Sequence, residues 1–420
     1  MEKKNIKTYD YKILLFLFVA IPLVDIINGV ILTINSDINI SLGKFYRIIT
    51  MIILSIITLK YSDKEFRKKH IVVFSLTLLM ILAFIGVFYI YHGSFKGIIY
   101  DGVTISKLLL IFLMIYTIFY LYNQKIIDKN IITNIFKCYI IIFPLTMIIP
   151  YIIGIGSSTY SSGLGYTGLY YANNDISIVL LICTIYSFDQ VIKKINILNI
   201  FIFLLNLSSL LLVGSKTGIL GLVLAVILYS IYYGSITLNE KSISKKNILK
   251  IILWALLFLI CTLVVFYPTF KKMIDRVIYF YNRDGNILAA LLSGREKFLL
   301  EAFNNLLNER FWILKLLFGV GFFYRKEWGI GELVEMDLFD ITFSLGVIVS
   351  LIIIYYLFKL LNKIIKSLNK ENYVYLVCII IMVLFSFIAG HVLFSALSGS
   401  ILSLVISGGY MFSEKDEIKE

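Results

Sequence analysis

The chain has 420 residues, of which 60% are hydrophobic and 15% aromatic, and its mean hydropathy is +0.91. These values exclude an ordinary soluble globule, whose apolar residues are fewer and more often interrupted. The net charge of +13 comes from short basic clusters between apolar stretches, which the positive-inside rule explains better than nucleic-acid binding does. We therefore predict an all-α polytopic membrane protein that does not bind nucleic acid.

Apolar segments follow one another along the whole chain, each long enough to cross a hydrocarbon core of roughly 30 Å as a helix. We predict about twelve transmembrane helices, at residues 13–34, 45–60, 71–91, 108–122, 131–153, 174–189, 196–213, 217–234, 250–268, 338–358, 374–390 and 393–411. No soluble domain interrupts them, so we expect one integral membrane domain over residues 1–420. The four cysteines lie inside apolar segments without the close pairing of a metal site or disulfide framework.

The basic residues predict the orientation of these spans. With the N-terminus inside, twenty-three Lys and Arg residues fall in cytoplasmic stretches and five in the short outer stretches. Positive charge concentrates on the cytoplasmic side of membrane proteins. We therefore expect both termini in the cytoplasm and one long loop, residues 269–337, on the outer side.

Two outer stretches have unusual compositions. The segment Arg295–Phe311 in the long loop has apolar residues at a helical spacing, which predicts an amphipathic helix on the membrane surface. These residues are Leu299, Phe303, Leu306 and Leu307. The segment Gly154–Asp175 is rich in Gly, Ser and Tyr and offers aromatic faces and hydroxyls to a sugar; the same composition is typical of a surface loop with interfacial aromatics.

Two cations lie next to turn residues on the predicted outer side. Lys216 stands in the sequence GSKTG between two apolar stretches, which suits an anion site or a lysine that snorkels to the membrane interface. Arg295 follows Ser293 and Gly294 just before the predicted amphipathic helix. A guanidinium there can grip a diphosphate through two points, anchor a lipid headgroup, or pair with Glu296.

Glu335, Asp337 and Asp340 gather at the predicted outer mouth of the tenth span. Carboxylates beside an apolar segment are costly, so one of them is a candidate general base. The alternative is a helix N-cap with favourable charges at a helix start. A divalent metal site is a weaker interpretation because no His or second acidic motif stands nearby.

Other polar residues in or beside the spans have more than one interpretation. Asp25 and Arg47 lie on adjoining predicted helices, where we favour a structural pair, although Arg47 also suits a lipid phosphate. His391 follows Gly390 near the outer end of the eleventh span and is interpreted as a packed, hydrogen-bonded histidine or as a substrate contact. Asn174, near the end of the Gly- and Tyr-rich outer stretch, is a further candidate substrate contact.

Several short motifs, in this order, resemble those of the O-antigen ligase/polymerase superfamily. They are GLYYANN at 168–174, GSKTG at 214–218, SGR at 293–295, GVG at 319–321, EMDLFD at 335–340 followed by Gly346, and GHVLFS at 390–395. The resemblance covers about residues 160–400. It implies a type C glycosyltransferase of the bacterial cytoplasmic membrane, metal-independent and without a cofactor, whose active site is extracytoplasmic.

Within that resemblance, the substrates are oligosaccharides linked to undecaprenyl diphosphate, and the partners are membrane lipids, a flippase and a chain-length regulator. In the ligase branch two Arg residues hold the diphosphate and a His acts as base. Here Lys216 stands where the first Arg is expected, Arg295 resembles the second, and Glu335 occupies the His position by its spacing to Gly346. These departures fit the polymerase branch better, so we expect a surface-polysaccharide polymerase of the O-antigen or capsule type.

Two alternatives stay open. A ligase would move finished polymer to another acceptor, which the sequence does not reveal. A polysaccharide-lipid flippase or other transporter shares the twelve-span layout with cytoplasmic termini. Carriers built from two six-span halves usually place their long connector in the cytoplasm between spans six and seven, where this chain has only the short stretch Gln190–Asn196.

Overall fold

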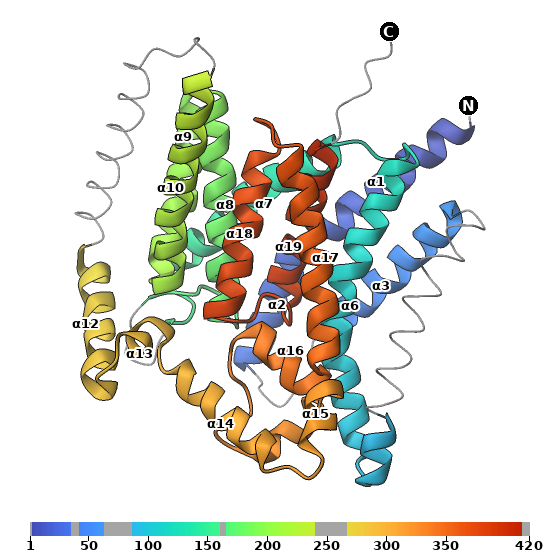
Figure 1. Cartoon of the computed structure of the whole chain (residues 1–420). Helices are drawn as coiled ribbons and strands as arrows, with labels where there is room; N and C mark the ends of the chain where they lie inside the picture. The colour runs from blue at the N-terminus through green and yellow to red at the C-terminus, as the bar shows by residue number, and fades with distance from the viewer. Residues whose placement is uncertain (1, 35–41, 63–85, 160–164, 240–266, 414–420) are drawn as a thin grey trace.

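The computed structural model describes residues 2–34, 42–62, 86–159, 165–239 and 267–413, and it is a bundle of α-helices (Figure 1). Seven candidate membrane spans occur in this part of the chain. They are α1 with α2 (Glu2–Val19 and Ile21–Ile34), α3 (Leu42–Tyr61), α6 (Phe95–Asn123), α7 (Asn130–Ile153), α8 (Asn173–Lys193), α17 (Val347–Lys366) and α19 (Ala396–Ser413). Three further apolar helices pack among them, α9 (Ile197–Val213), α10 (Lys216–Asn239) and α18 (Tyr373–Ile388). The chain is therefore a multi-pass α-helical membrane protein, as its composition predicted.

The predicted spans at 71–91 and 250–268 lie largely outside the described residues. Residues 267–345 form short helices that gather toward one end of the bundle, whereas α1 begins and α19 ends at the opposite end (Figure 1). We call the first of these the loop end. Its helices are α12 (Tyr267–Asp284), α13 (Ile287–Leu292), α14 (Arg295–Leu307), α15 (Trp312–Phe318), the 3-10 helix η2 (Tyr324–Trp328) and α16 (Asp337–Leu345).

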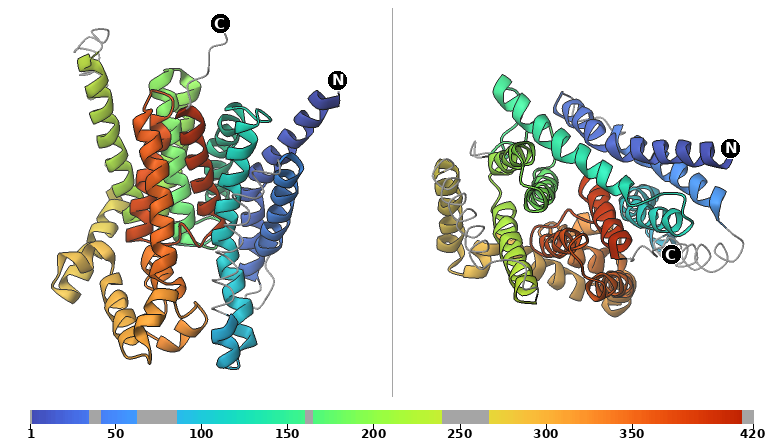
Figure 2. Two further views of the ribbon diagram at one scale, coloured as in Figure 1. Left: turned by 45° about the vertical axis from the view of Figure 1, so that its right-hand side comes forward. Right: turned by 90° about the horizontal axis from the view of Figure 1, so that it is seen from above.

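Helix α19 is the centre of the bundle. It packs against α6, α8, α17 and α18, which surround it when the molecule is seen from above (Figure 2). Almost every residue of α19 is buried, and many are small, such as Gly399, Ser403 and Gly408. Small residues let helix backbones approach closely inside a membrane bundle, where packing rather than water exclusion holds helices together. The aromatic ring of Tyr375 on α18 lies directly against Gly408.

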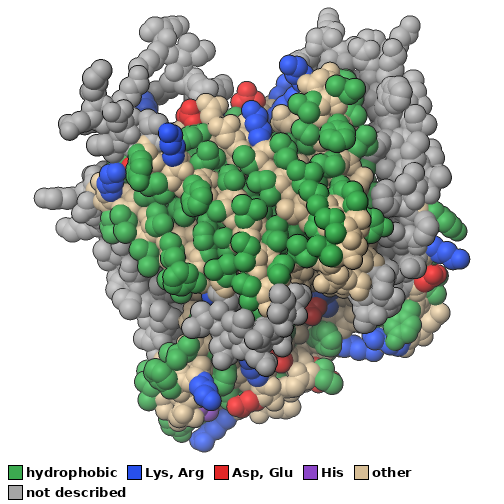
Figure 3. Space-filling view, turned by 180° about the vertical axis from the view of Figure 1, so that it is seen from behind, with side chains coloured by type: hydrophobic (Ala, Val, Ile, Leu, Met, Phe, Trp, Pro, Cys, Tyr) green, Lys and Arg blue, Asp and Glu red, His purple; other side chains and the backbone are tan. Residues whose placement is uncertain are grey.

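The surface of the bundle is divided into an apolar zone and charged zones. Figure 3 shows an apolar band across the middle of one face, with charged side chains above and below it. Lys60, Lys193 and Lys363 lie in the last turns of α3, α8 and α17, at the end opposite the loop end. Two of them also pair with buried acids, since Lys60 lies 2.8 Å from Asp10 and Lys193 lies 2.7 Å from Asp189.

The tenth predicted span, residues 338–358, is not one helix. It is divided at Gly346 into α16 and α17, and only α17 is long enough to be a candidate span. Gly346 has a φ of +91°, and a Cβ at this position would lie 2.1 Å from the carbonyl oxygen of Leu317. The backbone conformation and the close contact both require glycine, so the helix ends there despite the continuous apolar sequence. Asp337 and Asp340 therefore lie on a separate short helix.

A second, smaller core supports the loop end. Helix α14 lies where the amphipathic helix was predicted, but its apolar residues divide between two environments. Ala302 and Leu306 pack with Val334 and Phe343, whereas Phe303 remains exposed. This core joins α14 to α16 and the segment before it. Helices α14, α15, α16 and η2 are consequently fixed relative to one another by packing and do not depend on a membrane surface alone.

Candidate functional site

An ion pair between Arg295 and Glu335 lies at the centre of the loop-end site. Arg295 is the first residue of α14, and Glu335 lies in the segment that leads into α16. Nη2 of Arg295 lies 2.7 Å from Oε2 of Glu335, and the side chains are 12% and 40% exposed. Nε of Arg295 is buried without a hydrogen-bond partner. The guanidinium is thus held in place while part of its donor capacity remains unused.

The backbone at Glu335 is strained. Glu335 has a φ of +58° and His391 a φ of +64°, in the left-handed region that residues with a Cβ seldom adopt. The two segments touch: a Cβ on Gly390 would lie 2.5 Å from the carbonyl oxygen of Glu335. Strained residues persist where the surroundings over-determine them, and they concentrate at functional sites.

Two more cations approach the same turn. Lys216 follows the Gly214–Ser215 turn between α9 and α10, and Ser215 Oγ accepts the N–H of Gly218 at 3.0 Å, which caps α10. Nζ of Lys216 donates to the carbonyl of Ala290 at 2.9 Å and lies 5.3 Å from the ring centre of Phe280.

Arg283, on α12, lies beside the same Phe280 ring as Lys216. Its guanidinium lies 4.9 Å from the centre of the same Phe280 ring, and its Nη2 would be 3.0 Å from a Cβ on Gly294. Lys216, Arg283 and Arg295 thus surround the turn that connects α13 to α14. Three cations around one turn attract a multiply charged anion more strongly than an isolated arginine does.

Asp337 holds the 390–395 turn. Its Oδ1 accepts the N–H of His391 at 2.7 Å, and its Oδ2 accepts the N–H groups of Val392 and Leu393 at 2.7 and 2.9 Å. The hydroxyl of Ser386 donates to the same oxygen at 2.9 Å. Burial raises the pKa of Asp337, while these hydrogen bonds act to lower it. With its oxygens committed to donors, Asp337 is a structural residue of the site.

Asp340 is also committed to structure. Its Oδ1 lies 2.9 Å from Nη2 of Arg325 and accepts the N–H of Val334 at 2.9 Å. Arg325 is fully buried and also donates to Ser344 Oγ at 2.9 Å and to the carbonyl of Gly331 at 3.2 Å. Burial lowers the pKa of this guanidinium, and the negative charge of Asp340 opposes that effect. The pair fixes the loop against α16 and leaves Asp340 no access to a substrate.

The loop beyond α14 is tied together by Glu309. Its carboxylate accepts from Nζ of Lys315 at 2.7 Å, from the hydroxyl of Tyr324 at 3.3 Å and from Nε1 of Trp328 at 3.3 Å. Burial alone raises the pKa of Glu309, but the charge of Lys315 and these donors outweigh it, so the pKa lies below its ordinary value. Burial and the charge of Glu309 raise the pKa of Tyr324 to about 12.

The remaining sequence-predicted residues lie nearer the bundle axis. Asn174, in the first turn of α8, donates to the carbonyl of Ala389 at 3.3 Å. The partly buried His391 lies close enough to Asp175 and Asp337 for their charges to interact. Oδ2 of Asp175 accepts the hydroxyl of Ser395 at 2.5 Å. Both faces of the 390–395 turn thus carry polar groups.

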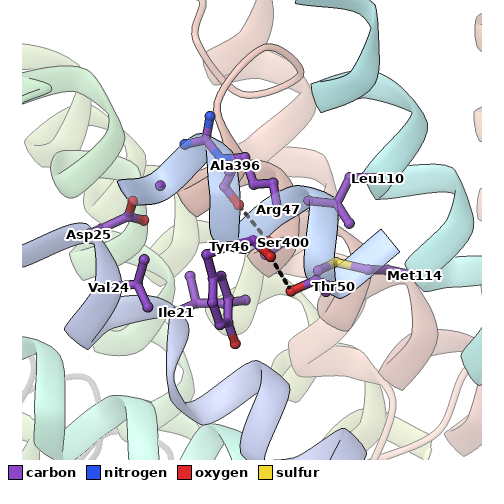
Figure 4. Close-up of a pocket in the computed structure, with 11 residues that line it drawn as sticks. Ile21, Val24, Asp25, Tyr46, Arg47, Thr50, Leu110, Met114, Ala396 and Ser400 are labelled. Carbon is purple, nitrogen blue, oxygen red and sulfur yellow. Dashed lines mark hydrogen bonds between the residues drawn. The ribbon is translucent and has the colours of Figure 1, made fainter. Parts of the chain in front are cut away.

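Asp25 and Arg47 do not form the expected salt bridge. Both line one small cavity, together with Tyr46 and Thr50 (Figure 4), but among the described residues Arg47 has no salt bridge or hydrogen bond. Both side chains approach Gly43, because a Cβ on it would lie 3.6 Å from Oδ1 of Asp25 and 3.7 Å from Nη2 of Arg47.

Sequence reasoning missed Arg283, Arg325, Lys107 and Asp175. Asp175 lies inside the predicted span 174–189 and Lys107 directly precedes the predicted span 108–122, so an ionisable residue in or beside a predicted span was the available signal. Arg283 and Arg325 had no such signal, because loop arginines are common, and only the fold shows that Arg325 is buried and that Arg283 lies beside Phe280 and Gly294.

The loop-end site therefore combines one accessible carboxylate with three surrounding cations and a strained backbone. No protein-family model, curated protein or solved structure matches this chain.

Proposed function

We propose that this protein is a surface-polysaccharide polymerase of the O-antigen or capsule type. It joins oligosaccharide repeat units carried on undecaprenyl diphosphate, at the outer face of the bacterial cytoplasmic membrane. The observation that supports this proposal best is the Arg295–Glu335 pair, a cation for a diphosphate in direct contact with a carboxylate that can serve as a base.

In the proposed reaction Glu335 takes the proton of a hydroxyl on the acceptor sugar. The hydroxyl oxygen attacks the anomeric carbon of the donor glycan and forms the new glycosidic bond, with inversion. The bond from that carbon to the diphosphate oxygen breaks, and its electron pair leaves with the lipid diphosphate. Arg295, Lys216 and Arg283 stabilise the negative charge that develops there.

Because Arg295 and Glu335 are paired before substrate binds, the donor glycolipid supplies the glycan and also releases the base. Arg295 and Glu335 neutralise each other before substrate arrives. A diphosphate carries more negative charge than a carboxylate and accepts two parallel N–H bonds from a guanidinium, so it competes for Arg295. Donor binding thus frees the Glu335 carboxylate for the acceptor hydroxyl.

The proposed function includes the finer topology that the sequence predicts. Twelve spans in a type C arrangement, both termini in the cytoplasm and the 269–337 segment outside would place the loop end where lipid-linked repeat units arrive. The lysines at the opposite end of α3, α8 and α17 support this orientation. The structural roles of Asp337 and Asp340 leave Glu335 as our candidate base among the three acids of the motif.

The test is to delete the gene from its host and to measure the lipid-linked glycans that accumulate, by mass spectrometry with assignment to the inner or outer leaflet. We expect single repeat units on the outer leaflet. Long lipid-linked chains on the outer leaflet would instead establish a ligase. Units retained on the inner leaflet would establish a flippase and overturn the proposal.

A further inference from the structure

Four ionisable side chains from four different helices meet inside the loop end of the bundle. They are Asp25 on α2, Arg47 on α3, Lys107 on α6 and Asp175 on α8. The charge of Arg47 acts on Asp25 and on Asp175, and the charge of Lys107 acts on Asp175 and on Arg47. Ionisable residues inside a membrane bundle are costly and are kept for pairing or for function.

These four residues are close together without bonding to one another. Across the described part of the chain, neither Arg47 nor Lys107 has a salt bridge or hydrogen bond, although both are partly buried. Oδ2 of Asp25 and Oδ1 of Asp175 are buried without a hydrogen-bond partner. Buried polar atoms in a folded protein are nearly always satisfied, so the unused groups indicate a ligand that completes the site.

The unused groups define the chemistry of that ligand. Two cations require anionic oxygens, and a phosphate supplies them. Two carboxylate oxygens require donors, and the hydroxyls of a sugar supply these. A ligand that carries phosphate and sugar hydroxyls side by side satisfies both pairs.

The position of the cluster connects it to the loop-end site. Asp175 accepts a hydrogen bond from Ser395 of the 390–395 turn. In the same turn, the N–H of His391 donates to Asp337. Gly390, which begins this turn, packs against the backbone of Glu335. The turn thus has the Arg295–Glu335 pair on one side and the buried cluster on the other.

The cavity beside Asp25 and Arg47 limits what enters between them (Figure 4). Its volume is about 10 Å³, room for about one water molecule. One phosphate oxygen or one hydroxyl fits there, so a ligand that binds Asp25 and Arg47 together must widen this cavity.

We propose that Arg47 and Lys107 bind the diphosphate of a second lipid-linked glycan, and that Asp25 and Asp175 bind hydroxyls of its sugars. This ligand is the acceptor, distinct from the donor whose diphosphate binds Arg295. The naming of donor and acceptor rests on the proposed function, whereas the existence of a second phosphate-sugar site rests on the four buried groups. A polymerase needs both ligands at once.

The experiment counts bound lipids on the purified full-length protein by native mass spectrometry, with undecaprenyl diphosphate as the probe. We expect two molecules on the wild type and one on Arg47→Ala, on Lys107→Ala and on Arg295→Ala. Arg47→Lys and Lys107→Arg should recover the second molecule, which separates lost charge from a folding defect. Lys96→Ala, an exposed change on the same helix as Lys107, is the matched control and should retain two.

The carboxylates are tested with an undecaprenyl-diphosphate-linked repeat unit. Asp25→Asn and Asp175→Asn should weaken the binding of this glycolipid at least tenfold, while undecaprenyl diphosphate itself binds as well as before. An equal loss of both probes would overturn the assignment of the carboxylates to sugar hydroxyls.

Three outcomes would separate the two proposals. If the Arg47 and Lys107 variants keep two molecules while Arg295→Ala loses one, the second site is wrong and the proposed function stands. If phosphatidylglycerol fills the second site as well as undecaprenyl diphosphate does, the site is a phospholipid-headgroup site, and the inference is overturned. If no variant changes binding, including Arg295→Ala, both proposals fail.

Discussion

Arg295 and Glu335 are 40 residues apart in the chain, yet Nη2 of the first lies 2.7 Å from Oε2 of the second. The contact depends on two features of the fold. Gly294 starts α14 so that its first residue faces the segment before α16, and the small core around Leu306 and Phe343 holds these two elements together. A cation and a carboxylate are thereby fixed side by side, as the proposed function requires.

The first prediction concerns this pair. Arg295→Ala should reduce polymerisation by about 10²–10³-fold, the cost of removing one donor that stabilises a developing negative charge. Glu335→Gln should reduce it by about 10²–10⁴-fold through loss of the base. Chain length is measured on polysaccharide gels from cells that express each variant at wild-type membrane levels. Lys297→Ala, an exposed change on the same helix as Arg295, should leave chain length unchanged. Wild-type chain lengths in both Arg295→Ala and Glu335→Gln would refute the mechanism.

The second prediction concerns Arg283, which the sequence did not single out. Under the proposed function Arg283 contacts the donor diphosphate, so Arg283→Ala should raise the KM for the donor about tenfold, the effect of roughly 1.5 kcal/mol for a charged hydrogen bond. The rate at saturating donor should change less, because Arg295 remains. Kinetics with purified donor measure both values. Arg310→Ala, another exposed loop arginine, serves as control; an unchanged KM in Arg283→Ala would remove this residue from the site.

The Arg295–Glu335 pair and the helix break at Gly346 show what the sequence can and cannot predict. The length of its apolar segments predicted most of the long helices in the described part of the chain, because each span must satisfy its own backbone inside a membrane. Arg295 was recognisable because it follows Ser293 and Gly294, and Glu335 because it belongs to an acidic cluster at the start of an apolar segment. Their pairing was not, because a contact across 40 residues depends on packing between α14 and α16. The helix break at Gly346 was missed for the same reason: the conflict with Leu317 exists only in the folded chain.

The third prediction separates structure from catalysis at Asp340. Asp340→Ala leaves the fully buried Arg325 without its carboxylate partner, which should destabilise the protein by about 3–5 kcal/mol. The measurement is thermal unfolding in detergent, with Asp275→Asn as the exposed acidic control. Arg325→Met combined with Asp340→Leu should regain part of the lost stability because no unpaired charge remains. An unchanged melting temperature in Asp340→Ala, with activity lost, would instead assign Asp340 to the chemistry.

The fourth prediction concerns pH and Glu309. Because its pKa is lowered in the folded state, Glu309 contributes stability above its unfolded pKa of about 4.3, and this contribution disappears as pH falls through the lower folded value. Glu309→Gln should therefore lower the melting temperature at pH 7, and the difference from wild type should shrink by pH 3.5. A difference that stays constant between these pH values would show that the carboxylate charge does not hold the loop. Glu301→Gln, an exposed change on α14, controls for general acid effects.

The fifth prediction uses the strained backbone of Glu335. At a φ of +58° a residue with a Cβ costs about 1–2 kcal/mol relative to glycine. Glu335→Gly should relieve this strain, and the lost ion pair with Arg295 is worth at most about 1 kcal/mol because Glu335 is 40% exposed. The melting temperature should thus stay equal to wild type or rise, while polymerisation is lost. Glu335→Ala keeps the strain and loses the pair, so it should melt lower than Glu335→Gly. If Glu335→Gly instead melts well below wild type, the residue holds the fold together, and its strained conformation is no evidence for a role in the reaction.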